Sequence, residues 1–255
     1  MSTDRRLTVG DIEVARIGLG TNRLTNTSEN RALLREALAA GINMIDTAHL
    51  YTGGESERTI AAALSPFPDG CVVATKGGYH DATPEVLRAE IEESLGRLET
   101  DTIELYYLHR VDRTTPIETS VRAIKDYQDQ GKIRHIGLSE VSVEQIEQAR
   151  TVATIAAVQN EYSLSQRRWD DVVDYCAEHG IPFVPYFPVR GQRSAMLSEI
   201  AASHGATPQQ VALAWLLKRS PTTVPIPGTL SIEHMRQNLD MLELELTDDE
   251  YRALM

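Results

Sequence analysis

Four short apolar segments, each ending at a polar or ionisable residue, most limit how this chain can fold. The residues that end them are Asp46, Lys76, His109 and Ser139. They follow one another at intervals of about 30 residues, which is enough chain for one strand and one returning helix. Because the carboxyl ends of parallel strands meet at one rim, the spacing predicts a barrel that carries its chemistry on that rim.

The whole chain alternates between strand-like and helix-like segments. We expect strands at Ile17–Thr21, Asn43–Asp46, Cys71–Lys76, Ile103–His109, Ile133–Ser139, Ala156–Asn160, Ile181–Tyr186 and Thr223–Ile226. We expect helices at Ser28–Ala40, Glu55–Leu64, Thr83–Leu98, Pro116–Gln130, Ser142–Thr151, Arg167–His179, Ser194–Ser203, Pro208–Lys218, Ser231–Met241 and Asp248–Leu254. Alternating strands and helices need parallel crossovers, so the pattern predicts an α/β fold, a single (β/α)8 TIM barrel over residues 1–255.

An open doubly wound sheet is the alternative architecture for this alternation. It would place a GxGxxG motif directly after the first strand. The segment Gly18–Arg23 lacks the third glycine and is not followed at once by a helix, so the barrel is favoured.

Ahead of the repeats, two short segments alternate apolar and polar residues. They are Leu7–Val9 and Ile12–Ala15, and a Gly-Asp dipeptide separates them. Such a dipeptide between alternating segments is typical of a hairpin turn. We therefore expect an N-terminal β-hairpin that closes the floor of the barrel.

Composition narrows the function before any motif is considered. The formal net charge is −12, so no nucleic-acid partner is expected. Two distant cysteines, Cys71 and Cys176, fit a reducing compartment, and no His/Cys cluster suggests a metal. No run approaches the roughly 18 apolar residues of a membrane span, and Met1–Gly10 lacks an apolar signal core. We expect a cytoplasmic protein without a membrane partner, monomeric, with a weak oligomer as the alternative.

The rim residues also suggest a reaction. Tyr51 follows Asp46 closely and is expected in the loop above the same rim. A tyrosine is a weak acid at neutral pH, but an ammonium such as that of Lys76 favours the phenolate and lowers its pKa. With His109 to orient a carbonyl oxygen, such a set can protonate that oxygen as negative charge develops on it, while a reduced cofactor supplies hydride. Taken singly, each residue is also compatible with a structural role, such as a helix cap or an ion pair.

Several longer stretches resemble the aldo-keto reductase superfamily. They are GINMIDTAHLYTGGESE (41–57), VVATKGG (72–78), LYYLHRVD (105–112), GKIRHIGLSE (131–140), VQNEYS (158–163), GATPQQVALAWLLKRSP (205–221) and TVPIPGT (223–229). The resemblance implies a (β/α)8 barrel that reduces an aldehyde or ketone with NADPH, or alternatively NADH. It also implies that Tyr51 is the general acid, tuned by Lys76 and Asp46. His109 would orient the substrate carbonyl.

The same resemblance implies a cofactor site. Ser139 and Gln159 match positions that bind the nicotinamide carboxamide, and Tyr186 matches the aromatic residue that stacks on the ring. The loop Phe187–Gly191 would lie along the pyrophosphate. The other positions implied at the cofactor are Thr21, Glu140, Pro188, Gly191, Gly228, Thr229, His234, Gln237 and Asn238.

Two departures from the family pattern affect this implied site. Glu140 stands where the family usually has asparagine. An ionised glutamate only accepts hydrogen bonds, so Glu140 could accept one from the carboxamide NH₂ but could not donate one to the carboxamide oxygen. Near the adenosine phosphate, His234 and Arg236 take the place of a lysine and an arginine. Because of Glu140, a cofactor-binding regulatory or sensing module with little turnover stays open. A Schiff-base lyase that uses Lys76 as nucleophile is a further alternative.

Overall fold

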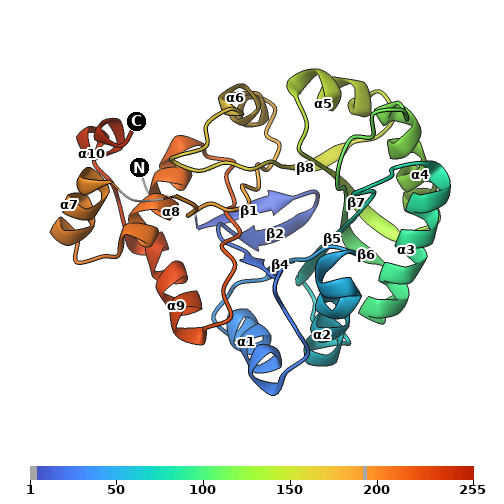
Figure 1. Cartoon of the computed structure of the whole chain (residues 1–255), viewed down its shortest axis with the longest axis horizontal. Helices are drawn as coiled ribbons and strands as arrows, with labels where there is room; N and C mark the ends of the chain where they lie inside the picture. The colour runs from blue at the N-terminus through green and yellow to red at the C-terminus, as the bar shows by residue number, and fades with distance from the viewer. Residues whose placement is uncertain (1–4, 192–193) are drawn as a thin grey trace.

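The computed structural model describes residues 5–191 and 194–255, and Figure 1 shows helices arranged around a central set of strands. The strands are β1 (Arg6–Val9), β2 (Ile12–Ala15), β3 (Leu19–Gly20), β4 (Met44–Asp46), β5 (Val72–Gly77), β6 (Ile103–Leu108), β7 (Ile133–Ser139) and β8 (Ile155–Gln159). The α-helices are α1 (Ser28–Ala39), α2 (Glu55–Leu64), α3 (Pro84–Leu98), α4 (Ile117–Asp129), α5 (Val143–Arg150), α6 (Asp170–Glu178), α7 (Ala195–Ser203), α8 (Pro208–Arg219), α9 (Ile232–Asp240) and α10 (Asp248–Ala253). Two short 3-10 helices are η1 (Tyr51–Gly54) and η2 (Met241–Glu243).

Strands β3 to β8 form one parallel sheet in sequence order. Its two edges are joined through segments that lack regular strand structure. Isolated parallel bridges run from Val158 to Phe183 and on to Thr223. A further parallel bridge joins Gly228 to Gly20 in β3. The paired strands therefore close into a ring, which is consistent with a (β/α)8 barrel.

The two joining segments differ from the prediction of regular strands at Ile181–Tyr186 and Thr223–Ile226, because only isolated bridges form there. The prolines in or directly beside them are Pro182, Pro185, Pro225 and Pro227. A proline has no backbone N–H to donate, so each one interrupts the ladder of hydrogen bonds. The apolar pattern correctly predicts buried, extended chain in these two segments, but the prediction of regular strands is wrong.

The other predicted elements form within three residues of their expected bounds. The largest shift is at the start of α6, which was expected from Arg167 and begins at Asp170. Trp169 explains this shift, since its backbone is not helical (φ −108°, ψ 26°) and it forms the N-cap.

The hairpin of β1 and β2 is antiparallel and lies across the centre of the ring in Figure 1. Val9, Ile12 and Val14 belong to one buried apolar cluster with residues that begin β4 and β5, Met44 and Val72. The hairpin therefore packs at the amino ends of the strands. That the hairpin closes the floor of the barrel stays a prediction.

The strand register staggers the polar strand ends around the opposite rim. Asp46 pairs with Ala74, two residues before Lys76. Lys76 in turn pairs with Tyr107, two residues before His109. Strands that tilt around a barrel need such a stagger, and it carries the three ionisable side chains to the same rim.

Candidate active site

A buried ion pair lies at the centre of the rim. Lys76 and Asp46 are 1% and 2% exposed, and Lys76 Nζ lies 2.6 Å from Asp46 Oδ1. The ammonium also donates to the carbonyl oxygen of Thr47 at 2.6 Å, and Gln159 Nε2 donates to Asp46 Oδ2 at 2.7 Å. Burial raises the pKa of the Asp46 carboxyl, and Lys76 and Gln159 oppose that rise. These additional hydrogen bonds hold both charged groups in one geometry.

Tyr51 lies above this pair. The Lys76 ammonium is 5.2 Å from the centroid of the Tyr51 ring, which is within cation–π range. The ring meets that of His109 edge-on, with centroids 6.0 Å apart. Burial raises the pKa of the Tyr51 phenol, and the neighbouring Lys76 charge offsets only part of that rise. The lowering expected from Lys76 is therefore present but outweighed, and the hydroxyl is protonated at neutral pH.

A tight turn positions Tyr51. Its backbone N–H donates to the carbonyl oxygen of Ala48 at 3.0 Å. Gly53 and Gly54 then adopt left-handed φ values of 65° and 83°, which glycine does without steric cost. A Cβ at Gly54 would lie 2.6 Å from the Arg97 guanidinium, so the turn needs a glycine there for space as well.

His109 is neutral and closes the other side of the rim. It is 4% exposed, and its backbone N–H donates to the carbonyl oxygen of Gly77 at 2.8 Å. Burial, together with the nearby charges of Lys76 and Arg110, lowers the pKa of His109 to about 2. Its Nδ1 has no hydrogen-bond partner among the described residues. A neutral imidazole keeps one N–H donor, which suits it to bind a carbonyl oxygen.

A cavity of about 530 Å³ opens in front of Asp46, Tyr51 and His109. The predicted cofactor residues that line it are Thr21, Ser139, Gln159, Tyr186, Pro188 and Gly228. Ser139 and Gln159 are buried and pair with each other at the ends of β7 and β8. A hydroxyl, a carboxamide and an aromatic ring in one cavity provide partners for an aromatic ring that bears an amide. The described residues therefore fit a nicotinamide.

Six predicted cofactor residues do not line this cavity: Glu140, Gly191, Thr229, His234, Gln237 and Asn238. Gly191 and Thr229 directly follow lining residues in the chain. The last three lie on α9, outside the cavity wall. Their part in cofactor binding stays a prediction.

Glu140 is engaged within the protein. Its Oε1 accepts a hydrogen bond from the backbone N–H of Glu161 at 2.6 Å, and its Oε2 pairs with Arg168. Its backbone is left-handed, with φ 56°. Each carboxylate oxygen already has one donor and can accept another, so a contact between Glu140 and the carboxamide stays a prediction.

Several residues of the cavity wall were missed by the sequence interpretation. They are Gly20, Asn22, Arg23, Leu50, Tyr79, Arg110 and Ile226. Arg110 is the most informative, since it donates to the carbonyl oxygen of His109 at 2.7 Å and to Ser139 Oγ at 3.3 Å. A basic residue directly after His109, at a strand end, was the signal that could have identified it.

The structure adds two observations about partners. Residues 5–191 and 194–255 contain no group of three or more His, Cys, Asp or Glu side chains that could hold a metal ion. Within the same ranges, no helix has the length and apolar character needed to cross a membrane.

Known proteins match this chain along nearly its whole length. The sequence model of the aldo/keto reductase family matches residues 16–194 and 191–255. Pyridoxine 4-dehydrogenase of Escherichia coli (strain K12) is 38% identical over 269 residues, which cover 95% of this chain and 94% of that protein. Probable aldo-keto reductase 1 of Glycine max is 32% identical, and the match covers 95% of this chain and 85% of that protein.

Solved structures that resemble this chain are also aldo-keto reductases. The thermostable aldo-keto reductase Tm1743, solved with the inhibitor epalrestat, superposes with a TM-score of 0.90 at 30% identity and covers 98% of both chains. An aldo-keto reductase of Klebsiella pneumoniae, solved with NADP and acetate, has a TM-score of 0.89 at 30% identity and covers 98% of this chain and 94% of its own.

The parallel fold, the ionisable rim and these matches together define an NAD(P)H-dependent oxidoreductase. The chain belongs to the aldo/keto reductase family.

Proposed function

We propose that the protein reduces an aldehyde or ketone to an alcohol by hydride transfer from NADPH, with Tyr51 as the general acid. The observation that carries this proposal is the convergence of Tyr51, His109 and the Lys76–Asp46 pair on one cavity. At the wall of that cavity a protonated phenol lies beside a neutral imidazole, and the Lys76 ammonium is buried behind the phenol. This set suits proton donation to an oxygen that becomes negative.

Each side chain has a distinct part in the proposed reaction. When bound, NADPH supplies the hydride that adds to the carbonyl carbon. The Tyr51 hydroxyl gives its proton to the carbonyl oxygen, and His109 donates a hydrogen bond to the same oxygen. Lys76 stabilises the phenolate that Tyr51 becomes. Asp46 keeps Lys76 charged and in place.

The cofactor proposal rests on the cavity and on the neighbours solved with NADP or NADPH. Ser139 and Gln159 would hold the carboxamide, and Tyr186 would lie against the ring. NADH stays an alternative, because Arg236 already pairs with Glu36 at 3.1 Å and the pair offsets part of its charge toward a 2′-phosphate. Thr21, Pro188 and Gly228 complete the proposed site, and Gly191, Thr229, His234, Gln237 and Asn238 extend it.

One chain suffices for this chemistry. The rim and its cavity come from a single (β/α)8 barrel domain, proposed to span residues 1–255 with the hairpin closing its floor. A monomer in the cytoplasm is therefore the simplest form of the enzyme, and a weak oligomer remains the alternative.

The substrate proposal begins with the relatives. Because a pyridoxine 4-dehydrogenase is 38% identical, pyridoxal belongs in the first substrate panel, beside simple aromatic aldehydes. A ketone series of similar size would show whether the cavity accepts both carbonyl classes.

The alternative functions fit the geometry less well. A Schiff-base lyase needs a neutral lysine, whereas Lys76 is buried against Asp46 and also donates to the carbonyl oxygen of Thr47. Borohydride trapping of substrate on Lys76 would restore that alternative. A sensing module would bind NADPH tightly without turnover across the panel.

The test compares Tyr51→Phe with the wild type in NADPH oxidation by 4-nitrobenzaldehyde. We expect the loss of the proton donor to lower kcat by about 10²- to 10⁴-fold. Tyr79→Phe is the matched control, because it removes a hydroxyl from the same cavity wall and should leave kcat within about threefold of the wild type. Equal rates for Tyr51→Phe and the wild type would exclude Tyr51 as the acid.

A further inference from the structure

Arg110 is a cation in the cavity wall that has only neutral partners. Its guanidinium donates to the carbonyl oxygen of His109, to Ser139 Oγ and to the Tyr186 hydroxyl, at 2.7, 3.3 and 3.4 Å. It also lies 5.1 Å from the centroid of the Tyr79 ring. No carboxylate in residues 5–191 and 194–255 forms an ion pair with it. An arginine has five N–H donors, so Arg110 can still bind an anion.

The cavity is positive although the chain as a whole is negative. Its described lining includes Arg23, Arg110 and Arg190, and Asp46 is the acidic residue among them. The charge of Asp46 is balanced by Lys76. The net charge of the chain is −12, so this local excess of arginine runs against the overall composition. A concave positive wall raises the local concentration of anions.

Arg110 lies at the reacting end of the cavity. It directly follows His109, and its guanidinium lies over the ring of Tyr79, whose centroid is 4.8 Å from that of His109. Arg190, by contrast, belongs to the loop proposed for the pyrophosphate and pairs with Glu161 at 3.2 Å. An anion bound to Arg110 is therefore next to the carbonyl-binding residue rather than next to the pyrophosphate loop.

We propose that Arg110 binds an anionic group of the substrate, so that the preferred substrates are aldehydes or ketones that carry a carboxylate or a phosphate. This inference rests on the proposed carbonyl reductase function and names the substrate class for the same cavity. The planar guanidinium can bind either group through two parallel hydrogen bonds. The neighbouring imidazole of His109 is uncharged, so Arg110 supplies the positive charge at that position.

The test uses substrate pairs that differ in charge but not in the reacting group. 4-Carboxybenzaldehyde is compared with methyl 4-formylbenzoate, and glyceraldehyde 3-phosphate with glyceraldehyde. We expect the wild-type enzyme to favour at least one anionic member by about tenfold or more in kcat/KM. The pair that shows the preference identifies a carboxylate or a phosphate as the recognised group.

Arg110→Gln then removes the charge. We expect kcat/KM for the preferred anionic substrate to fall by about 10- to 100-fold, and that for its neutral partner to change by less than about threefold. Arg110→Lys keeps a point charge without the planar fork and should restore part of the preference. Arg110 also contacts Ser139 and Tyr186, so each variant is titrated with NADPH by fluorescence. The proposal expects the dissociation constant to change much less than kcat/KM for the anionic substrate.

Three results would overturn the inference. The wild type would show no preference within either pair, or Arg110→Gln would weaken the charged and neutral substrates equally, or its NADPH affinity would account for the whole loss. Each is distinguishable from a failure of the proposed function. If the proposed function itself were wrong, Tyr51→Phe would reduce the neutral aldehydes as fast as the wild type does.

Discussion

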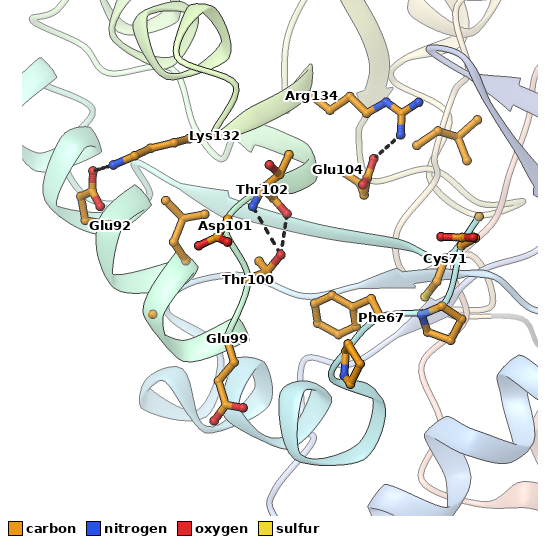
Figure 2. Close-up of a pocket in the computed structure, with 17 residues that line it drawn as sticks. Phe67, Cys71, Glu92, Glu99, Thr100, Asp101, Thr102, Glu104, Lys132 and Arg134 are labelled. Carbon is orange, nitrogen blue, oxygen red and sulfur yellow. Dashed lines mark hydrogen bonds and ion pairs between the residues drawn. The ribbon is translucent and has the colours of Figure 1, made fainter.

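Two hollows lie at opposite ends of the barrel, one at the carboxyl ends of the strands and one near their amino ends. The hollow near the amino ends is the larger, at about 860 Å³ against about 530 Å³. Figure 2 shows its charged residues, with Lys132 directed at Glu92 and Arg134 at Glu104. These side chains are 29% to 50% exposed, so water reaches every pair.

At the carboxyl-end cavity, by contrast, the central ion pair is buried. The side chains of Lys76 and Asp46 are 0% and 3% exposed, and burial raises the pKa of Asp46. Near the amino ends, the hydrogen bond from Lys132 lowers the pKa of Glu92 and outweighs the opposing effect of burial. Volume therefore does not identify the reactive site. The signs of chemistry are converging, desolvated groups whose ionisation the surroundings control.

Breaking the buried pair should have the largest effect. Lys76→Met leaves Asp46 buried without a cation, and loss of one partner of a buried pair costs about 3–5 kcal/mol. Activity should fall as well, because the phenolate of Tyr51 loses its counterion. Denaturant melts would measure the stability and NADPH oxidation the activity.

Lys132→Met is the matched change in the other hollow. Its pair with Glu92 is exposed, so the expected cost is about 0–1 kcal/mol with no change in kcat. Similar losses of stability for the two variants would contradict the contrast between the hollows.

Tight packing at the rim should make Gly77→Ala the next most harmful change. A Cβ at Gly77 would fall 2.0 Å from the Tyr106 hydroxyl and 2.6 Å from Glu90 Oε2. Tyr106 is fully buried and has little room to move, so overpacking should cost about 1–3 kcal/mol. The strain adjoins Lys76, and kcat should fall too. An unchanged melting curve and an unchanged kcat would show that this rim tolerates added volume.

Acid should destabilise the rim through His109. The ordinary pKa of a histidine is 6.5, and in the folded protein that of His109 is about 2. Below about pH 6.5 the unfolded chain binds a proton that the folded chain excludes. The free energy of unfolding therefore decreases as the pH is lowered, by up to about 1.4 kcal/mol per pH unit. His109→Gln lacks this contribution. Its unfolding free energy should fall by about 1 kcal/mol less than that of the wild type between about pH 7 and pH 5.5.

His234→Gln, at an exposed position, serves as the control for the pH series and should follow the wild-type curve. If the wild type and His109→Gln lose stability in parallel over this range, His109 does not exclude the proton.

The sequence predicted the rim because its signals are local. Asp46, Lys76 and His109 each follow an apolar segment directly, and parallel crossovers carry such strand ends to one side. The regular strands β4 to β8 were predicted closely for the same reason. Ser139 and Gln159, which the family resemblance placed at the cofactor, were also found at adjacent strand ends.

What the sequence could not provide depends on contacts between distant residues. The partner of Glu140 is Arg168, on a later segment, and no local pattern indicates that pair. The net direction of the Tyr51 pKa depends on how deeply the fold buries the phenol. The partners of Arg110 likewise come from three separate segments of the chain, at His109, Ser139 and Tyr186. In each case tertiary packing decides which of two opposing effects is larger.

The smallest expected effect tests the tolerance of the amino-end hollow. Gly96 lies in α3, lines that hollow and has no atom within 4 Å of the position where a Cβ would be. Gly96→Ala should therefore stabilise the protein by about 0.5–1 kcal/mol, because alanine loses less conformational entropy in a helix. Thermal melts of this variant and of Gly77→Ala should shift in opposite directions. A destabilised Gly96→Ala would mean that the amino-end hollow is as closely packed as the rim, and the contrast between the two ends of the barrel would then rest on charge burial alone.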